Sequence, residues 1–296
     1  MATNGQDEGG FYKDHGGPIG VDQLHPNDSR ENALEKIRTA GSVSIPPELF
    51  EKLYLSPENK VKGDLRKTFG NPTPIGLTGF LLCVTPLACF LMNWRGTRPG
   101  NGAADIPVYL FFGGILLNVA GVMEWILGNT YISVVFMSYG CFCLSYGGVL
   151  QPFYGAYAAY APDPVNAPQE GAMQPGFLNS FAFFLLFMGL LSLVFLVCSI
   201  RTNLVFFLIL SPLPAAFSCI AAAFWYSGMN EASTAATLFT AGGALAFVTC
   251  IFGWYLWTAL LLASVDAPIQ LPVFDLSTRI KGFSERKSKV QDDGPV

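Results

Sequence analysis

Long apolar segments, separated by short polar stretches, occupy most of the chain between residues 71 and 264. A helix needs about 20 mainly apolar residues to cross roughly 30 Å of hydrocarbon. Six segments meet that length, at about 75–93, 107–128, 130–150, 177–199, 203–226 and 236–264. Each must be helical, because lipid offers no hydrogen-bond partner to an open backbone N–H or C=O group. The pattern therefore predicts an all-α, polytopic membrane protein with six transmembrane helices.

The basic residues predict an orientation for these helices, because Lys and Arg are enriched in cytoplasmic loops. With six spans both termini share a side, and placing both inside leaves only Arg95 and Arg98, of 17 basic residues, outside. We therefore expect both termini to be cytoplasmic. No signal peptide is visible, so the first span is expected to direct insertion.

This arrangement divides the chain into four parts. Residues 1–44 are polar and rich in Gly, which predicts a disordered cytoplasmic tail. In residues 45–70, two prolines followed by apolar side chains favour an amphipathic segment at the membrane surface, although a partly ordered linker fits equally well. Residues 71–264 are expected to form the six-helix transmembrane domain, and residues 265–296 a cytoplasmic C-terminal tail.

Composition supports a membrane protein and excludes several other classes. The chain is 51% hydrophobic and 13% charged, against about 25% charged in ordinary soluble domains. Its net charge is −4 and it has no basic face, so we expect no nucleic-acid partner. A P-loop, a nucleophile elbow and an H-E-x-x-H motif are all missing from the sequence. We expect no enzymatic activity and no cofactor.

Cysteine and histidine placement predicts no metal site. All seven cysteines fall in apolar segments, whereas His15 and His25 lie in the polar N-terminal region. Cys141 and Cys143 form a C-x-C pair, but without further ligands such a pair is better explained by helix packing.

The stretch Asn71-Pro72-Thr73-Pro74 marks the start of the first predicted helix. Prolines suit a helix N-terminus, where free N–H groups and the positive end of the helix dipole are available to an anion. The stretch is therefore a candidate substrate contact. A rigid turn that only begins the helix explains the same residues.

Glu124 is the one ionisable side chain well inside a predicted span. Such a group is costly in lipid and usually marks a functional site. Two interpretations stand: Glu124 acts as a proton or substrate relay or a required interhelical hydrogen bond, or it is a hydrated anchor near the interface beside Trp125.

Two further features concern the third and fifth spans. Tyr139, Phe142 and Tyr146 share one helix face, which could line a path, although packing against neighbours or contact with lipid is the favoured expectation. Pro212 and Pro214 predict a kink with freed carbonyl groups.

Several motifs together resemble the acetate uptake transporter family, which includes bacterial succinate/acetate permeases and fungal acetate and ammonia-export proteins. The string N-P-T-P-I-G-L at Asn71–Leu77, followed by Phe80, is similar to that family's N-P-A-P-L-G-L signature. Further similar blocks follow in order: Glu124 with Gly128-Asn129-Thr130, Ser138-Tyr139-Gly140, Arg201-Thr202-Asn203, and Ala241-Gly242-Gly243. The resemblance runs from about Glu48 to Leu276.

The resemblance implies a hexamer of six-helix protomers, each with its own path and a narrow apolar constriction. At the corresponding positions this sequence has Phe80, Tyr139 and Leu213. The flanking Pro212 and Pro214 depart from the family pattern and affect the expected geometry around Leu213.

We therefore expect a plasma-membrane transporter or channel for acetate and similar small monocarboxylates, coupled to protons or favoured by low external pH. The candidate substrate path comprises Asn71, Pro72, Thr73, Phe80, Tyr139 and Leu213, with Glu124 as relay or structural acid. Two alternatives stay open: a channel for ammonia, ammonium or urea, and a receptor-like signalling membrane protein.

Overall fold

A computed structural model describes residues 69–97, 102–274 and 276, and within them every regular element is helical. The predicted tail 1–44 and nearly all of segment 45–70 lie outside the described residues, as does most of the C-terminal tail.

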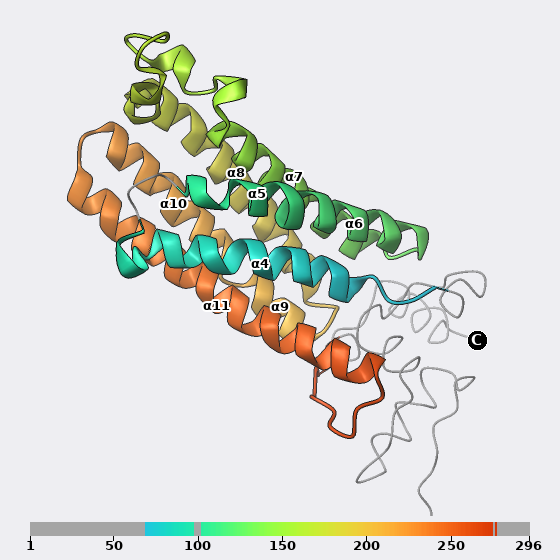
Figure 1. The fold of residues 1–296 in the computed structure, drawn as a ribbon. Helices are drawn as coiled ribbons and strands as arrows, with labels where there is room; N and C mark the ends of the chain where they lie inside the picture. The colour runs from blue at the N-terminus through green and yellow to red at the C-terminus, as the bar shows by residue number, and fades with distance from the viewer. Residues whose placement is uncertain (1–68, 98–101, 275, 277–296) are drawn as a thin grey trace, which may run out of the picture. The chain divides into compact units, whose positions relative to one another are not determined.

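Within these described residues, six helical spans are long and apolar enough to cross a membrane (Figure 1). They are α4 (Thr73–Leu91); a second span of η2 (Ala103–Asp105), α5 (Ile106–Val108), η3 (Tyr109–Leu116) and α6 (Leu117–Ile126); α7 (Thr130–Leu150); α8 (Pro175–Ser199); α9 (Leu204–Leu210) with α10 (Leu213–Gly228); and α11 (Ala232–Ser264). Their bounds fall within a few residues of the predicted ones. The prediction of six apolar helices is confirmed.

Short helical turns connect several of these spans. They are η1 (Trp94–Gly96) after α4, and η4 (Pro152–Tyr154), η5 (Ala158–Tyr160) and η6 (Pro168–Met173) between α7 and α8. We call residues 151–174 the long loop; it lies beyond the ends of α7 and α8 in Figure 1. A Cβ added to Gly171 would lie 1.7 Å from the carbonyl oxygen of Tyr157, so η5 and η6 pack closely.

The spans pack in a defined order. α10 lies between α8 and α11, α11 runs along α4, and α4 contacts the second span, which packs on α7. Gly242 and Gly243 let α11 approach both neighbours: an added Cβ would lie 2.6 Å from a side-chain carbon of Ile220 and 2.7 Å from Leu91 Cβ, respectively. Small residues at a helix contact allow this close approach of backbones in a membrane protein.

α7 meets α8 and α10 mainly through large aromatic rings. Tyr139 and Phe195 have ring centroids 5.9 Å apart, and the centroids of Phe142 and Phe217 are 5.2 Å apart. Rings of this size hold the backbones apart, which leaves room for an interior space.

The fifth span is broken between α9 and α10, as its prolines predict. Pro212 has no N–H, so it cannot donate to the carbonyl of Leu208 four residues earlier. The hydroxyl of Ser211 donates to that carbonyl instead, at 3.1 Å. The break makes Leu213 the first residue of α10.

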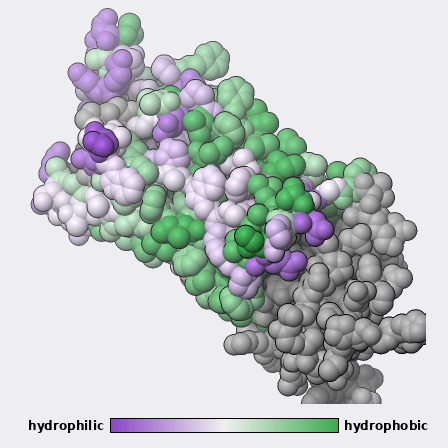
Figure 2. All heavy atoms as spheres, turned by 60° about the horizontal axis from the view of Figure 1, so that its bottom comes forward, coloured by the Kyte–Doolittle hydropathy of each residue, from purple (hydrophilic) through white to green (hydrophobic). Residues whose placement is uncertain are grey.

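The outward faces of the helices are apolar. α8 exposes Phe183, Phe187 and Leu190 to 54%, 62% and 55%, and α6 exposes Trp125 to 67%. In Figure 2 a hydrophobic band occupies the middle of the visible face, with hydrophilic side chains gathered towards its ends. Such a surface suits lipid or a second apolar surface.

The C-terminal residues that follow α11 are joined to the turn between α8 and α9. The N–H of Leu204 donates to the carbonyl of Phe274 at 2.8 Å, and the N–H of Leu276 donates to that of Thr202 at 3.1 Å. Val273 is 1% exposed. Part of the expected C-terminal tail is therefore packed on the helices. We call residues 272–274 and 276 the C-terminal strap.

Candidate functional site

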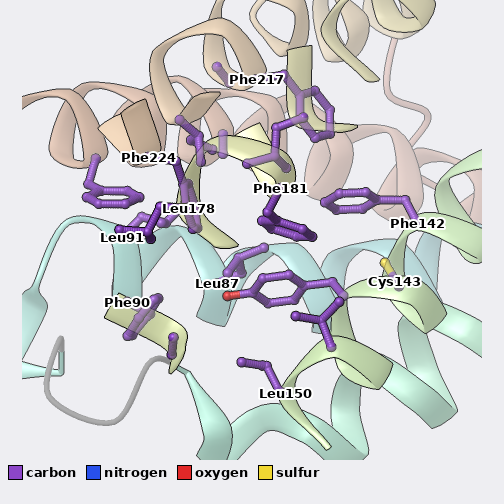
Figure 3. A pocket seen from close by; sticks show the side chains of 18 of the residues that line it. Leu87, Phe90, Leu91, Phe142, Cys143, Leu150, Leu178, Phe181, Phe217 and Phe224 are labelled. Atoms are coloured by element: carbon purple, nitrogen blue, oxygen red, sulfur yellow. The ribbon is translucent and has the colours of Figure 1, made fainter. Parts of the chain in front are cut away.

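A cavity of about 630 Å³ lies among α4, α7, α8, α10 and α11 (Figure 3). Phe142, Phe181 and Phe217 are among the rings that point into it. The long loop contributes Gln169 and Met173, and Met173 is 66% exposed. The cavity therefore reaches the surface at the long loop.

The deep end of the cavity is formed by Phe80, Tyr139 and Leu213, which we call the ring residues. Each is at most 8% exposed, and the ring centroids of Phe80 and Tyr139 are 6.3 Å apart. Phe217, one turn after Leu213 on α10, stacks on Tyr139 with an interplanar angle of 3°. The structure thus brings the three predicted side chains to one place; their role as a constriction stays a prediction.

Tyr139 is held in position by a chain of hydrogen bonds. Its hydroxyl donates to Ser192 Oγ at 2.8 Å, and Ser192 Oγ donates to the carbonyl of Met188 at 2.7 Å. Ser192 is fully buried, so this chain fixes the Tyr139 ring against α8.

The polar side chains of the cavity wall are neutral. Among the described residues, none of the side chains that line the cavity is charged. An ion entering the cavity would lose hydration without meeting an opposite charge, which is costly. The cavity therefore favours a neutral molecule or one with a large apolar part.

Glu124 lies apart from the cavity, in a cluster with Thr73 and Asn129 that we call the acid cluster. Glu124 is 0% exposed. One of its carboxyl oxygens accepts a hydrogen bond from the Thr73 hydroxyl, and the other accepts one from the Asn129 side-chain amide. The interpretation of Glu124 as a hydrated anchor is wrong, because the end of α6 packs against the start of α4 and α7 and excludes water there.

The start of α4 has no free N–H group in the described turn. The N–H of Thr73 donates to Asn71 Oδ1 at 2.9 Å, and those of Ile75 and Gly76 donate to the carbonyl of Pro72 at 3.0 and 3.2 Å. Pro74 has no N–H to offer. The expectation that free N–H groups await an anion is therefore wrong. Asn71, Pro72 and Thr73 do not line the cavity.

The aromatic face of α7 lines the cavity. Tyr139, Phe142 and Tyr146 are all among the lining residues, and their rings also pack against rings of α8 and α10. This face therefore combines two of the alternatives that the sequence left open, a cavity wall and helix packing. Phe217, which follows Leu213 by four residues and also lines the cavity, was not identified from the sequence.

The C-x-C pair does not act as one unit. Cys141 is exposed, whereas Cys143 is buried with its Sγ 3.5 Å from that of Cys83. The two side chains thus point to different surroundings, as packing residues do.

In the long loop, local hydrogen bonds stabilise the carboxylate of Asp163. Asp163 accepts hydrogen bonds from the backbone N–H and the side-chain amide of Asn166 and from the backbone N–H of Val165. These bonds stabilise the carboxylate, led by that of the Asn166 N–H, and lower its pKa from the ordinary value.

The sequence of this chain is similar to those of several known proteins. The model of the GPR1/FUN34/yaaH family matches residues 55–278. Protein alcS of Aspergillus fumigatus is 41% identical over 248 residues, which cover 83% of this chain and 90% of that protein. The acetate transporter protein patA of Penicillium expansum is 30% identical over 199 residues, 67% of this chain and 75% of that protein.

Two further comparisons bear on function and fold. Ammonia transport outward protein 2 of Saccharomyces cerevisiae is 25% identical over 276 residues, covering 87% of this chain and 89% of that protein. The solved structure of the bacterial acetate channel SatP matches with a TM-score of 0.53 and 21% identity, covering 69% of this chain and 99% of that chain. At this identity the structural match concerns the fold alone.

Proposed function

Since the chain belongs to the GPR1/FUN34/yaaH family, we propose that it carries acetate and similar small monocarboxylates across a membrane. The observation that supports this most is the cavity, which reaches inward from the long loop and ends at Phe80, Tyr139 and Leu213. These ring residues come from three different spans. The family consists of transporters or channels, which points to a protein that is not an enzyme.

The chemistry of the cavity suits a small acid with an apolar end. Rings and aliphatic side chains tolerate a methyl group, whereas a hydrated inorganic ion would lose too much solvation among them. Acetic acid titrates near pH 4 to 5, roughly as a Glu side chain does. Its neutral form enters an uncharged cavity more readily, so we propose that uptake is coupled to protons or favoured by low external pH.

We also propose how the protein is oriented in the membrane. Both termini, with the regions 1–44, 45–70 and 265–296, face the cytoplasm, as the distribution of basic residues favours. The long loop then faces outside, and the cavity opens towards the external medium. We propose the plasma membrane as the location, because uptake from the medium takes place there.

The opposite end of the path is proposed to lie near the start of α4. Asn71 and Pro72 shape this helix end, and Thr73 connects it to Glu124. Glu124 acts there either as a proton relay or as a required hydrogen-bond acceptor. The two roles differ in what a Gln substitution does, as discussed below.

We propose a homohexamer as the assembled form. The apolar outward faces of α6 and α8 are consistent with contact to lipid or to a second copy. Chemical cross-linking or native mass spectrometry of the purified protein should show a closed oligomer, and a stable active monomer would contradict it.

Uptake of labelled acetate by purified protein in liposomes tests the substrate. We expect uptake above that of protein-free liposomes, and faster uptake with an inward proton gradient. Uptake equal to protein-free liposomes, together with passage of ammonium or urea, would show that the substrate is wrong.

Ammonia transport is the second candidate, because two relatives from Saccharomyces cerevisiae are named for it. The uncharged cavity wall disfavours the ammonium cation but admits neutral ammonia. Acetate competition separates the two: a path for ammonia alone is not blocked by acetate, whereas a shared path is.

A further inference from the structure

The hydroxyl groups of the cavity wall differ in whether they already donate a hydrogen bond to another protein atom. Tyr139 donates to Ser192 at 2.8 Å, Tyr157 donates to the carbonyl of Leu150 at 3.4 Å, and Ser227 donates to that of Ala223 at 2.8 Å. Each of these hydroxyl protons is therefore committed to the protein.

Tyr146 is the exception among the hydroxyl groups of the cavity wall. Its side chain lines the cavity, and among the described residues its hydroxyl has no hydrogen-bond partner. The neighbouring Tyr109 hydroxyl also lacks a partner, but it is enclosed by protein atoms, whereas that of Tyr146 is not. The Tyr146 O–H is thus free to donate to a molecule in the cavity.

Neighbouring rings fix where this hydroxyl lies. Tyr109 meets the Tyr146 ring edge-on at 5.0 Å between centroids, and Phe142 stacks on it at 6.3 Å. Tyr146 follows Tyr139 by two turns of α7, which corresponds to about 10 Å along the helix axis. The hydroxyl therefore lies between the mouth of the cavity and the ring residues.

We propose that the Tyr146 hydroxyl donates a hydrogen bond to the carboxyl group of the substrate before it reaches the ring residues. An apolar cavity without a cationic side chain offers a carboxyl group few partners, so one fixed O–H donor determines its position. The methyl end then points into the aromatic wall. The inference rests on the proposed acetate transport and adds a specificity-determining residue to it.

The test is the concentration dependence of acetate uptake by Tyr146→Phe in liposomes. Removing the hydroxyl keeps the ring and leaves no protein group unsatisfied, so the variant is expected to fold with an unchanged Tm. We expect KM for acetate to rise about tenfold, with a change of less than about twofold in the maximal rate.

Tyr157→Phe is the matched control. It removes a hydroxyl from the same cavity wall, but one that is already bonded to the Leu150 carbonyl. We expect its KM to stay within about twofold of the wild-type value. An equal rise of KM in both variants would show that the general polarity of the wall matters, which overturns the proposal.

The outcomes also separate this inference from the proposed function. If the wild-type protein takes up acetate and Tyr146→Phe has the wild-type KM, then Tyr146 is not the donor and only this inference fails. If the wild-type protein moves no acetate, the proposed function itself fails. A lowered Tm with an unchanged KM would assign Tyr146 to packing and overturn the inference as well.

Discussion

The two sides of the ring residues are built differently. Towards the long loop, aromatic side chains of α7, α8 and α10 surround a cavity of about 630 Å³. On the other side, the acid cluster is closed by hydrogen bonds, and Tyr131 packs edge-on against Phe195 and Phe206 while its hydroxyl donates to the Phe195 carbonyl at 2.5 Å. A molecule can enter the first side without breaking protein contacts. Passage through the second side requires contacts to open, so the barrier extends beyond the ring residues.

The largest expected effect comes from removing the carboxyl group of the closed side. Glu124→Ala leaves the Thr73 hydroxyl and the Asn129 amide without their buried acceptor and opens a small void. We expect a loss of about 3 kcal/mol in the free energy of unfolding. Thermal unfolding in detergent and the yield of folded protein measure it.

Glu124→Gln is the matched control for that substitution. Its carbonyl oxygen can still accept from Asn129, and its NH₂ group can donate to the Thr73 oxygen, so we expect a loss of only about 1 kcal/mol. A relay predicts that Gln removes the pH dependence of acetate uptake, whereas a structural acceptor predicts that Gln keeps it. Normal stability and transport in both variants would contradict either role.

The second prediction concerns the boundary between the two sides. Leu213→Ala removes most of an apolar side chain from the ring residues, and we expect larger acids such as lactate or succinate to enter. Competition of these acids with labelled acetate measures the substrate range. If the range stays the same and stability falls by about 2 to 5 kcal/mol, Leu213 belongs to the packing core instead.

Leu210 provides the control for Leu213. It is 1% exposed, ends α9 and does not line the cavity. Leu210→Ala is therefore expected to lower the free energy of unfolding by about 2 to 3 kcal/mol without changing the substrate range.

Among the alanine substitutions of buried residues, the smallest expected effect on stability lies at the C-terminal strap, which is joined to the turn between α8 and α9. Val273→Ala removes two carbons from a buried position, and we expect a loss of about 2 kcal/mol in stability. Because Val273 does not line the cavity and its neighbour Phe274 is bonded to the first residue of α9, KM for acetate should not change. Ile269→Ala, at a position that is 64% exposed, should leave the Tm unchanged. A changed KM in Val273→Ala alone would show that the strap acts on the path.

The sequence predicted the helices well because length and apolarity are sufficient to identify a membrane span. It also identified the break at Pro212, since a missing N–H is visible in the sequence itself. The partners of Glu124 were not predictable, because Thr73 lies 51 positions earlier in the chain. The sequence left the role of the Phe142 and Tyr146 face open for a physical reason: a side chain that faces an apolar cavity and one that faces lipid are equally apolar.

The start of α4 shows a second limit of sequence reasoning. Two prolines mark a helix beginning, but they do not reveal that the Pro72 carbonyl and the Asn71 side chain already accept the N–H groups of that turn. Whether a helix end can bind an anion depends on these local bonds, and they depend on backbone angles that the residue types do not determine.

The C-terminal strap also sets the order in which the protein can be completed during synthesis. The first N–H of α9, on Leu204, needs the Phe274 carbonyl, and the Thr202 carbonyl accepts from Leu276. Chain growth proceeds from the N-terminus, so α8 and α9 leave the ribosome long before these partners exist. The turn between α8 and α9 therefore cannot form these two hydrogen bonds until α11 and the C-terminal strap have been synthesised. Chains that stop before residue 272 therefore lack the acceptor of the Leu204 N–H and the donor to the Thr202 carbonyl, and this turn stays incomplete in them.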